Sequence, residues 1–471
     1  MTRPLNFKKH RMIWSASILA ILVCAVGRAS DSASWWVTTS DKSMLLAKQA
    51  PALPFAITAP NEFLTLTVDP TRHYQGIDGF GFALTGGSAE HLIRLPAAQR
   101  SALLKELFSS EGDGIGISYL RVSIGASDLN DRVFSYDDLA PGQTDLLLAN
   151  FTLSDDLSNV VPVLKEILAL NPAIKILGSP WSAPTWMKTN GNIQGGKLKP
   201  EFYSVYANYF VRYIQAMAGE GIPIDAITIQ NEPFNDGNTP SMQMFAKEQA
   251  EFIKHHLGPQ FRAAGINTKI ILYDHNCDAP EFPVSILTDP EAGKFVAGSG
   301  FHLYAGQTSA MTKVHDYFPA KNIYFTEMMA VDRRGFNISN PVSRILIGAT
   351  RNWSRNVILW NLAANAKFEP HTDNGGCAMC QGAITLESGR VERNLAYYVI
   401  GHASKFVPPG SVRIESTWDA ALPNVAFRTP TGGFVLIVAN VSDGPRKFNV
   451  SCDGKSAPVE LVAGAVATFV W

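Results

Sequence analysis

The chain has 471 residues, of which 46% are hydrophobic and 17% charged, and its formal net charge at pH 7 is −1. That length can bury a sizeable core in one large domain or two ordinary ones. The near-neutral balance gives no electrostatic reason to expect a nucleic-acid partner or an acidic membrane surface.

The first 29 residues have the pattern of a secretory signal peptide. Basic residues from Arg3 to Arg11 precede an apolar run from Met12 to Val26, and small residues precede a cleavage site near Ala29. An uncleaved anchor is the alternative, although the run is short for a membrane helix. We therefore expect a secreted or periplasmic protein without a membrane span after cleavage. The oligomeric state is not predicted.

Residues 35–60 carry few strong signals. In residues 63–68, apolar and polar residues then alternate as in a half-buried strand. From residue 76, short apolar runs recur, each followed by Gly, Pro, Asn or Asp and then by a helical stretch. The predicted strands are residues 79–83, 119–124, 174–179, 226–230, 269–273, 300–303, 323–326 and 357–360. The clearest predicted helices are residues 96–107, 157–170, 201–218 and 244–264.

Alternating strands and helices indicate parallel βαβ units. Eight such units over roughly 300 residues fit an α/β protein of the (β/α)8 TIM-barrel type better than an open doubly wound sheet. No Gly-x-Gly-x-x-Gly lies between a strand and a helix and no Walker loop occurs, which disfavours a nucleotide-binding alternative.

The helical pattern stops near residue 395. Beyond it, the predicted strands are residues 412–414, 425–428, 433–438, 447–451 and 462–471. Since the strand at 63–68 needs a partner, both chain ends are expected to build one β-sandwich. The predicted domains are a signal peptide (1–29), an N-terminal segment of the sandwich (30–75), a catalytic barrel (76–394) and a C-terminal sandwich (395–471).

Four cysteines remain after cleavage: Cys277, Cys377, Cys380 and Cys452. Cys377 and Cys380 form a lone Cys-x-x-Cys. A zinc site usually needs two more ligands nearby, and only His371 is close. A local disulfide or two free thiols is therefore the favoured interpretation, and no metal or cofactor is expected.

In a (β/α)8 barrel, the chemistry lies where the strands end. Glu232 follows the end of the fourth predicted strand and Glu327 the end of the seventh. Two carboxylates at one mouth suggest glycoside hydrolysis, in which one protonates the leaving oxygen and the other attacks or activates water. Taken singly, Glu232 could be a helix-start residue and Glu327 a surface acid. Further polar and aromatic residues near strand ends are Asp128, Trp181, His302, Tyr304 and Trp360.

Six motifs make the sequence resemble glycoside hydrolase family 30, which contains glucosylceramidases and endo-β-1,6-glucanases. They lie at residues 76–81, 179–188, 229–233, 273–276, 325–327 and 401–406. Asn231-Glu232-Pro233 alone marks a wide clan of barrel glycosidases, whereas the segment 179–188, which begins Ser-Pro-Trp, is much more specific.

The resemblance implies a retaining double displacement with Glu232 as general acid/base and Glu327 as nucleophile, their carboxyl groups about 5–5.5 Å apart. It implies that Asn231 bonds the sugar 2-hydroxyl. The residues implied to bind sugar or flank the nucleophile are Arg121, Asp128, Trp181, His302, Tyr304 and Trp360. Alternatives are core packing for Trp181 and Trp360, an interior histidine for His302 and ion pairing for Arg121. The roles of Asp274 and His275 stay open.

Two loops depart from the glucosylceramidase pattern. Thr85 is followed by Gly86-Gly87 instead of Asp, and residues 375–382 differ from the mammalian lysosomal form. The predicted function is cleavage of β-glucosidic bonds in a carbohydrate or glycolipid, with glucosylceramide-like substrates first. The alternatives are an endo-β-1,6-glucanase and a β-xylan-cleaving relative. A non-catalytic carbohydrate-binding protein is disfavoured because both glutamates are present.

Overall fold

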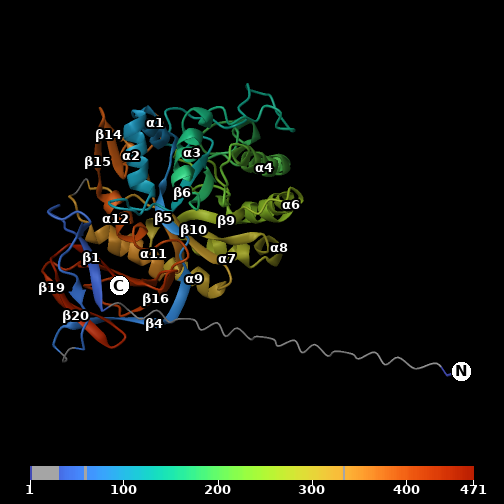
Figure 1. The fold of residues 1–471 in the computed structure, drawn as a ribbon. Coiled ribbons are helices and arrows are strands. Elements are labelled where there is room, and N and C mark those ends of the chain that lie inside the picture. Colours follow the sequence, from blue (N-terminus) through green and yellow to red (C-terminus); the bar gives the residue numbers. More distant parts are fainter. Residues whose placement is uncertain (3–30, 58–60, 333–334) are drawn as a thin grey trace.

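The computed structural model describes residues 1–2, 31–57, 61–332 and 335–471. Nearly all of the predicted signal peptide therefore lies outside the described residues. The described chain forms a barrel and a β domain, which lie side by side (Figure 1). None of its helices combines the length and apolar character needed to span a membrane.

Eight parallel strands close into the barrel in the order β10-β11-β12-β5-β6-β7-β8-β9. Their bounds are β5 Gly79–Ala83, β6 Tyr119–Ile124, β7 Lys175–Pro180, β8 Ala226–Thr228, β9 Lys269–Cys277, β10 Val296–Gly306, β11 Asn322–Glu327 and β12 Ser354–Leu359. All eight correspond to predicted strands, so the (β/α)8 prediction is confirmed. The strands are buried and rich in Val, Ile, Leu and Phe, as expected of a parallel sheet covered by helices.

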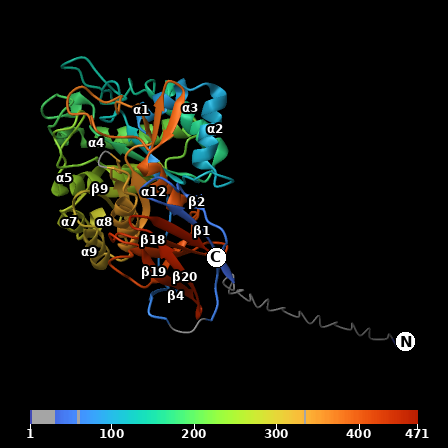
Figure 2. The same cartoon turned by 90° about the vertical axis from the view of Figure 1, so that its left-hand side faces the viewer.

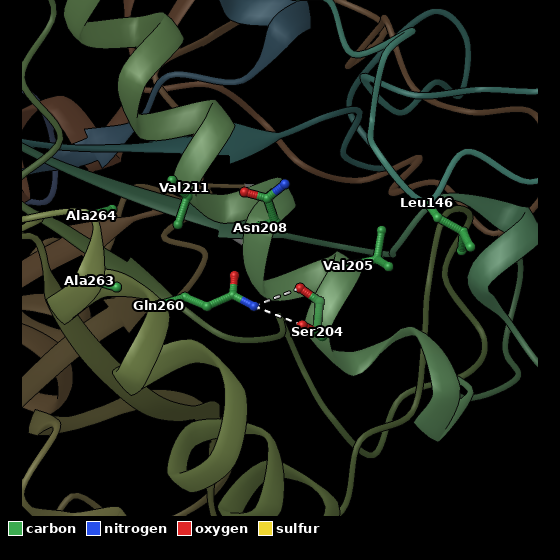
Figure 3. A pocket seen from close by; sticks show the side chains of 8 residues that line it. All are labelled: Leu146, Ser204, Val205, Asn208, Val211, Gln260, Ala263 and Ala264. Atoms are coloured by element: carbon green, nitrogen blue, oxygen red, sulfur yellow. Dashed lines mark hydrogen bonds between the residues drawn. The ribbon is translucent and has the colours of Figure 1, made fainter.

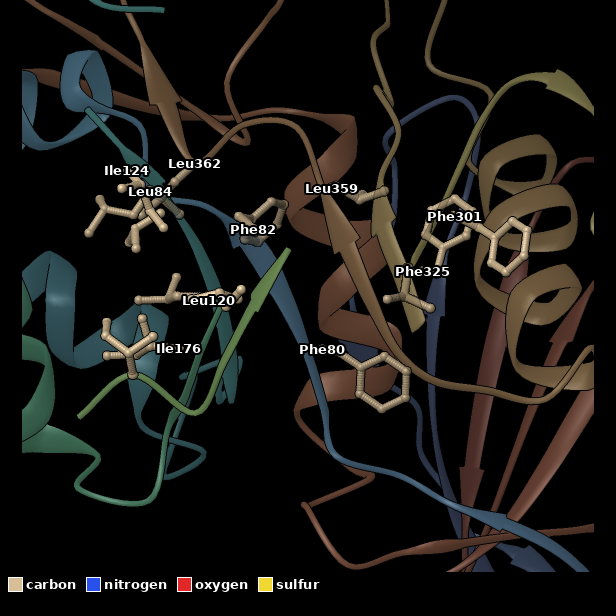
Figure 4. Packing of buried hydrophobic residues seen from close by; sticks show 14 of the residues in the cluster. Phe80, Phe82, Leu84, Leu120, Ile124, Ile176, Phe301, Phe325, Leu359 and Leu362 are labelled. Carbon is tan, nitrogen blue, oxygen red and sulfur yellow. The ribbon is translucent and has the colours of Figure 1, made fainter. Parts of the chain in front are cut away.

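The outer helices are α1 Gly86–Arg94, α2 Ala97–Phe108, α3 Val160–Leu170, α4 Tyr203–Gly219, α5 Ala246–Phe252, α6 Gly258–Ala263, α7 Glu281–Leu287, α8 Pro290–Gly293, α9 Ser309–Tyr317, α10 Ser339–Pro341, α11 Gly348–Arg351 and α12 Leu395–Ser404. One π-helical turn, Ile253–Leu257, joins α5 to α6, and another, Val342–Ile347, joins α10 to α11. The apolar core fills the space between strands and helices, as Phe82, Leu120 and Phe325 show in Figure 4.

The expectation that helices stop near residue 395 is wrong, because α12 begins there. All ten residues of α12 are buried, so the helix lacks the polar face on which a periodicity argument depends. Figure 2 shows α12 between the barrel and the β domain. His402 explains part of this packing, since its ring nitrogens hydrogen-bond Thr468 Oγ1 at 2.8 Å and Thr38 Oγ1 at 2.9 Å in the β domain.

The β domain contains a ten-stranded sheet with the order β2-β1-β21-β18-β17-β16-β4-β19-β20, in which β3 also pairs with β1. The strands are β1 Ser32–Thr38, β2 Ala47–Lys48, β3 Leu53–Pro54, β4 Leu64–Gly76, β16 Val412–Ser416, β17 Asn424–Arg428, β18 Phe434–Ala439, β19 Arg446–Cys452, β20 Lys455–Leu461 and β21 Val466–Val470. Because β4 pairs with β16 and β19, the prediction that both chain ends build this domain is confirmed.

Candidate active site

A cavity of about 160 Å³ lies at the carboxyl ends of the barrel strands. A cavity of about 150 Å³ accepts a benzene molecule, so this space suits one six-membered sugar ring. The lining residues are Asp128, Trp181, Asn231, Glu232, Asn238, Tyr304, Glu327, Met329, Trp360, Cys377 and Cys380. Seven of the nine predicted site residues are among them. The other two, Arg121 and His302, lie directly behind the glutamates, as their bonds show.

A wider hollow of about 470 Å³ lies on the outside of the barrel between α4 and α6 (Figure 3). Gln260 crosses part of it and donates to the Ser204 carbonyl oxygen at 2.9 Å. No acid, base or histidine lines this hollow. Glu232 and Glu327 line the smaller cavity at the barrel mouth instead.

Glu327 ends β11 and is held by two donors. Arg121 Nη1 donates to Oε2 at 2.5 Å, and the Tyr304 hydroxyl donates to Oε1 at 3.0 Å. Burial raises the pKa of Glu327, and the positive charges of His302 and Arg121 oppose that rise. A carboxylate held on both oxygens has a fixed direction, which a nucleophile needs.

Glu232 follows β8 and faces Glu327. Its Oε1 lies 3.3 Å from His302 Nδ1, and its Oε2 accepts from Asn235 Nδ2 at 2.6 Å. Burial alone would raise the pKa of Glu232, but the hydrogen bond and charge of His302, with His275 and Asn235, lower it to about 2. Its backbone φ of 47° lies in the left-handed region, which non-glycine residues rarely adopt and which clusters at functional sites.

Asp274 joins these groups from beneath the cavity and is fully buried. It accepts from Arg121 Nη2 at 2.8 Å, Thr326 Oγ1 at 2.6 Å and Thr228 Oγ1 at 2.7 Å. His302 Nε2 lies 3.1 Å from Oδ1 of Asp274. Burial would raise the pKa of Asp274, but Arg121 and His302 hold it well below its usual range. The aspartate therefore stays ionised and keeps a proton on His302 Nε2.

His302 carries a positive charge at neutral pH. Burial lowers its pKa, but Glu327 and the bonds to Asp274 and Glu232 raise it overall to about 9. The proton nearest to Glu232 therefore lies on His302 Nδ1. These groups titrate as one coupled set, so a change in one carboxylate alters the proton affinity of the others.

Aromatic rings and one neutral acid form the rest of the cavity. The Trp181 and Trp360 rings stack with centroids 5.3 Å apart, and the Arg121 guanidinium lies 4.8 Å from the Trp181 ring. Burial, and then the charges of Glu327 and Glu232, raise the pKa of Asp128 to about 8. At pH 7 the Asp128 carboxyl is therefore protonated and can donate a hydrogen bond to a hydroxyl.

The two glutamates are close. One oxygen of Glu232, one of Glu327 and one ring nitrogen of His302 all lie within 4.8 Å of one another. Oxygens this close fit the short carboxyl separation of retaining glycosidases, about 5–5.5 Å, better than the about 6.5–9.5 Å of inverting ones. The same trio fits a metal ion poorly, because Arg121 already neutralises Glu327 and His302 would have to lose its proton.

The high pKa of His302 predicts a pH-dependent stability. The folded protein binds this proton more tightly than the unfolded chain, whose histidine pKa is about 6.5. The contribution is fully present below pH 6.5 and is lost as pH rises to about 9. We expect the free energy of unfolding to fall across this range by up to about 1.4 kcal/mol per pH unit from this group.

Urea denaturation at pH 6.5 and pH 9 would measure the effect, with His302→Asn expected to flatten the slope. The surface residue His255, replaced in the same way, is the control. A wild-type slope in His302→Asn would contradict the assignment. The Asp128 pKa, raised to about 8, acts in the same direction, since its stabilising proton is also lost as pH rises.

Several site residues were not predicted: Asn235, Asn238 and Met329. They lie in loops after strand ends, where sequence spacing does not determine which way a side chain points. The roles of Asp274 and His275 were left open by the sequence. In the structure, Asp274 pairs with Arg121 and His302, and His275 Nδ1 lies 3.9 Å from Glu232 Oε1. The Cys-x-x-Cys forms the local disulfide that was one of its two favoured interpretations.

Comparison with known proteins gives two family matches. The glycosyl hydrolase family 30 TIM-barrel domain matches residues 77–407, and the β-sandwich domain of the same family matches residues 410–469.

Among curated relatives, endo-1,6-beta-D-glucanase neg1 of Aspergillus fumigatus is 33% identical over 440 residues, 88% of each chain. The endo-1,6-beta-D-glucanase of Neurospora crassa is 35% identical over 434 residues, 88% of this chain and 89% of that one. The lysosomal acid glucosylceramidase of Mus musculus is 28% identical over 440 residues, 87% of this chain and 83% of that one. Among solved structures, the endo-beta1,6-glucanase BT3312 is 34% identical with a TM-score of 0.85, covering 93% of this chain and 99% of that one.

Proposed function

The chain belongs to glycosyl hydrolase family 30 and is a glycoside hydrolase, and we propose that it cleaves β-1,6-glucosidic bonds in glucans with retention of configuration. The observation that supports retention best is the short approach of Glu232 to Glu327 in a cavity for one sugar ring. The relatives named for β-1,6-glucanase activity reach 33–35% identity, against 28% for the mouse glucosylceramidase. This reverses the order expected from the sequence, in which glucosylceramide-like substrates came first.

In the proposed mechanism, Glu327 attacks the anomeric carbon while Glu232 protonates the leaving oxygen. The bond from Glu327 to the sugar forms as the glycosidic bond breaks, and Glu232 then takes a proton from the water that releases the sugar. Arg121 and Tyr304 hold Glu327 in its attacking direction. The other site residues position Glu232, Glu327 and the sugar, or set the charges of the two glutamates.

Glu232 must carry a proton before the first step, although its neighbours lower its pKa to about 2. His302 Nδ1 supplies one across 3.3 Å when a bound sugar excludes water and weakens the ionised form of Glu232. Asp274 keeps the remaining proton on His302 Nε2. Glu232 thus becomes the acid only when a substrate is present.

The sugar-binding roles follow from the orientation of each group. Arg121 Nη2 donates to Asn231 Oδ1 at 2.7 Å, so the Asn231 amide NH₂ is left to donate to the sugar 2-hydroxyl. Trp181 and Trp360 line the cavity and give the bound sugar an apolar wall, and protonated Asp128 offers a donor. Together these groups account for binding of one glucosyl ring.

A product analysis tests the proposal. We expect rapid release of short products from a β-1,6-glucan, little turnover of glucosylceramide and none of xylan. Early products followed by NMR should be β-anomers, because two inversions restore the starting configuration. An α-anomer would contradict retention, whereas faster turnover of glucosylceramide would favour the second candidate, a glucosylceramidase of sphingolipid metabolism.

We also infer export through the signal peptide at residues 1–29. The Cys377–Cys380 disulfide supports this inference, because disulfides persist in oxidising compartments. N-terminal sequencing of the secreted protein should find a start near Ser30. Retention of the intact N-terminus would favour the uncleaved anchor.

A further inference from the structure

The Cys377–Cys380 disulfide forms part of the wall of the sugar cavity. Both cysteines line the same space as Glu232 and Glu327. Cys380 is buried at 2% exposure, whereas Cys377 is half-buried. A bond between residues three apart in sequence ties down only a short loop, so its position at the mouth calls for a local explanation.

The disulfide touches the strand end that carries Glu327. Met329 Sδ lies 3.2 Å from Cys380 Sγ and 4.0 Å from Cys377 Sγ. Met329 follows Glu327 by two residues and pairs with Trp360 in a parallel bridge. A separate buried cluster contains Cys380, Trp181 and Trp360. The disulfide is thus in contact with the groups that shape the cavity.

The loop that bears the disulfide borders the mouth and is anchored on the loops that follow β6 and β8. Thr372 N donates to the Asp128 carbonyl at 2.9 Å, and Thr372 Oγ1 donates to the Thr239 carbonyl at 2.7 Å. A Cβ at Gly375 would lie 2.4 Å from the Gly237 carbonyl oxygen, which explains why glycine is needed there. The loop is fixed at one end by these contacts and at the other by the disulfide against Met329.

We propose that this disulfide is a substrate-positioning part of the sugar site, which holds Met329 and Trp360 as a rigid wall for the bound glucosyl ring. The proposal rests on the proposed β-1,6-glucanase function. When a dithiol reductant attacks, the S–S bond breaks, the protein gains two thiols, and the reductant becomes a cyclic disulfide. The half-buried Cys377 is the accessible sulfur. The loosened wall then binds sugar less tightly, while Glu232 and Glu327 keep their own partners.

The test is steady-state kinetics on a β-1,6-glucan with and without dithiothreitol, with reduction verified by mass spectrometry. We expect KM to rise about tenfold, equivalent to about 1.4 kcal/mol of binding, with kcat within about twofold. The double variant Cys377→Ser/Cys380→Ser should show the high KM without reductant and no response to it. Cys452→Ser, which replaces a buried free cysteine of the β domain, is the matched control and should respond like wild type.

An unchanged KM after verified reduction would overturn the proposal. Loss of kcat together with a lower unfolding temperature would also overturn it, because it would mean that the bond only supports the fold. If the oxidised protein cleaves no β-glucoside, the proposed function has failed instead. The role of the disulfide can then still be tested by calorimetry, which compares the affinity of the oxidised and the reduced protein for glucose. Equal affinities would reject the proposed wall.

Discussion

Replacing Glu327 with glutamine is expected to lower kcat on a β-glucan on the order of 10⁴-fold, about 5.5 kcal/mol of barrier. Glutamine has the shape of glutamate but cannot form a glycosyl-enzyme. Its carbonyl oxygen can still accept from Tyr304 or Arg121, so the cavity should keep its form. The measurement is single-turnover and steady-state hydrolysis, with sugar binding followed separately by calorimetry.

The matched control is Glu166→Gln. It removes a half-buried carboxylate on helix α3 that pairs with Arg100 on helix α2 at 2.9 Å. It should keep wild-type turnover, because it lies outside the cavity. Glu327→Gln should keep sugar binding within about tenfold, since most contacts with the ring come from other groups. Wild-type turnover in Glu327→Gln would remove the nucleophile assignment and the double displacement with it.

The charges behind the cavity explain why the two glutamates differ. Arg121 and His302 are positive, and Asp274, Glu232 and Glu327 are negative, all within one buried network. Removing one partner of such a network leaves an uncompensated buried charge, which typically costs about 3–5 kcal/mol. Arg121, which reaches Asp274, Glu327 and Asn231 at once, is therefore both a structural and a site residue.

The sequence was sufficient for the barrel and for the two glutamates because both depend on local patterns. Apolar runs of four to six residues are recognisable singly, and parallel strands of a barrel all end at one mouth. Glu232 and Glu327, more than 90 residues apart in the sequence, could therefore be placed together from their positions after strands four and seven.

The rest depends on contacts between distant segments. Asp274 matters because Arg121, Thr228, Thr326 and His302 converge on it from four other strands, and no spacing within 273–276 reveals that. Helix α12 was missed because it has no exposed face. The loop around Cys377 could be recognised as unusual, but its path over the mouth is set by packing on Asp128 and Thr239.

Replacing Glu232 with alanine is expected to have an effect that depends on the leaving group. A substrate with a poor leaving group, such as a β-1,6-glucan, should lose about 10²–10⁴-fold in kcat/KM, the usual contribution of general acid catalysis. An aryl β-glucoside with an acidic phenol departs without a proton, so its first step should be nearly unaffected. Its second step should become limiting, because no base activates water, and a burst of phenol should precede slow turnover.

Small anions provide the sharper half of this test. Azide needs no general base, and alanine leaves room beside His302 where Glu232 Oε1 stood, so azide should accelerate release and yield a β-glucosyl azide. Asn235→Ala, which removes only the hydrogen bond to Glu232 Oε2, is the control and should show neither burst nor rescue. Equal losses on all substrates, without azide rescue, would mean that Glu232 shapes the cavity but transfers no proton. Rescue with an α-azide product would mean that the anion attacks the opposite face, and hence that Glu327 forms no covalent intermediate.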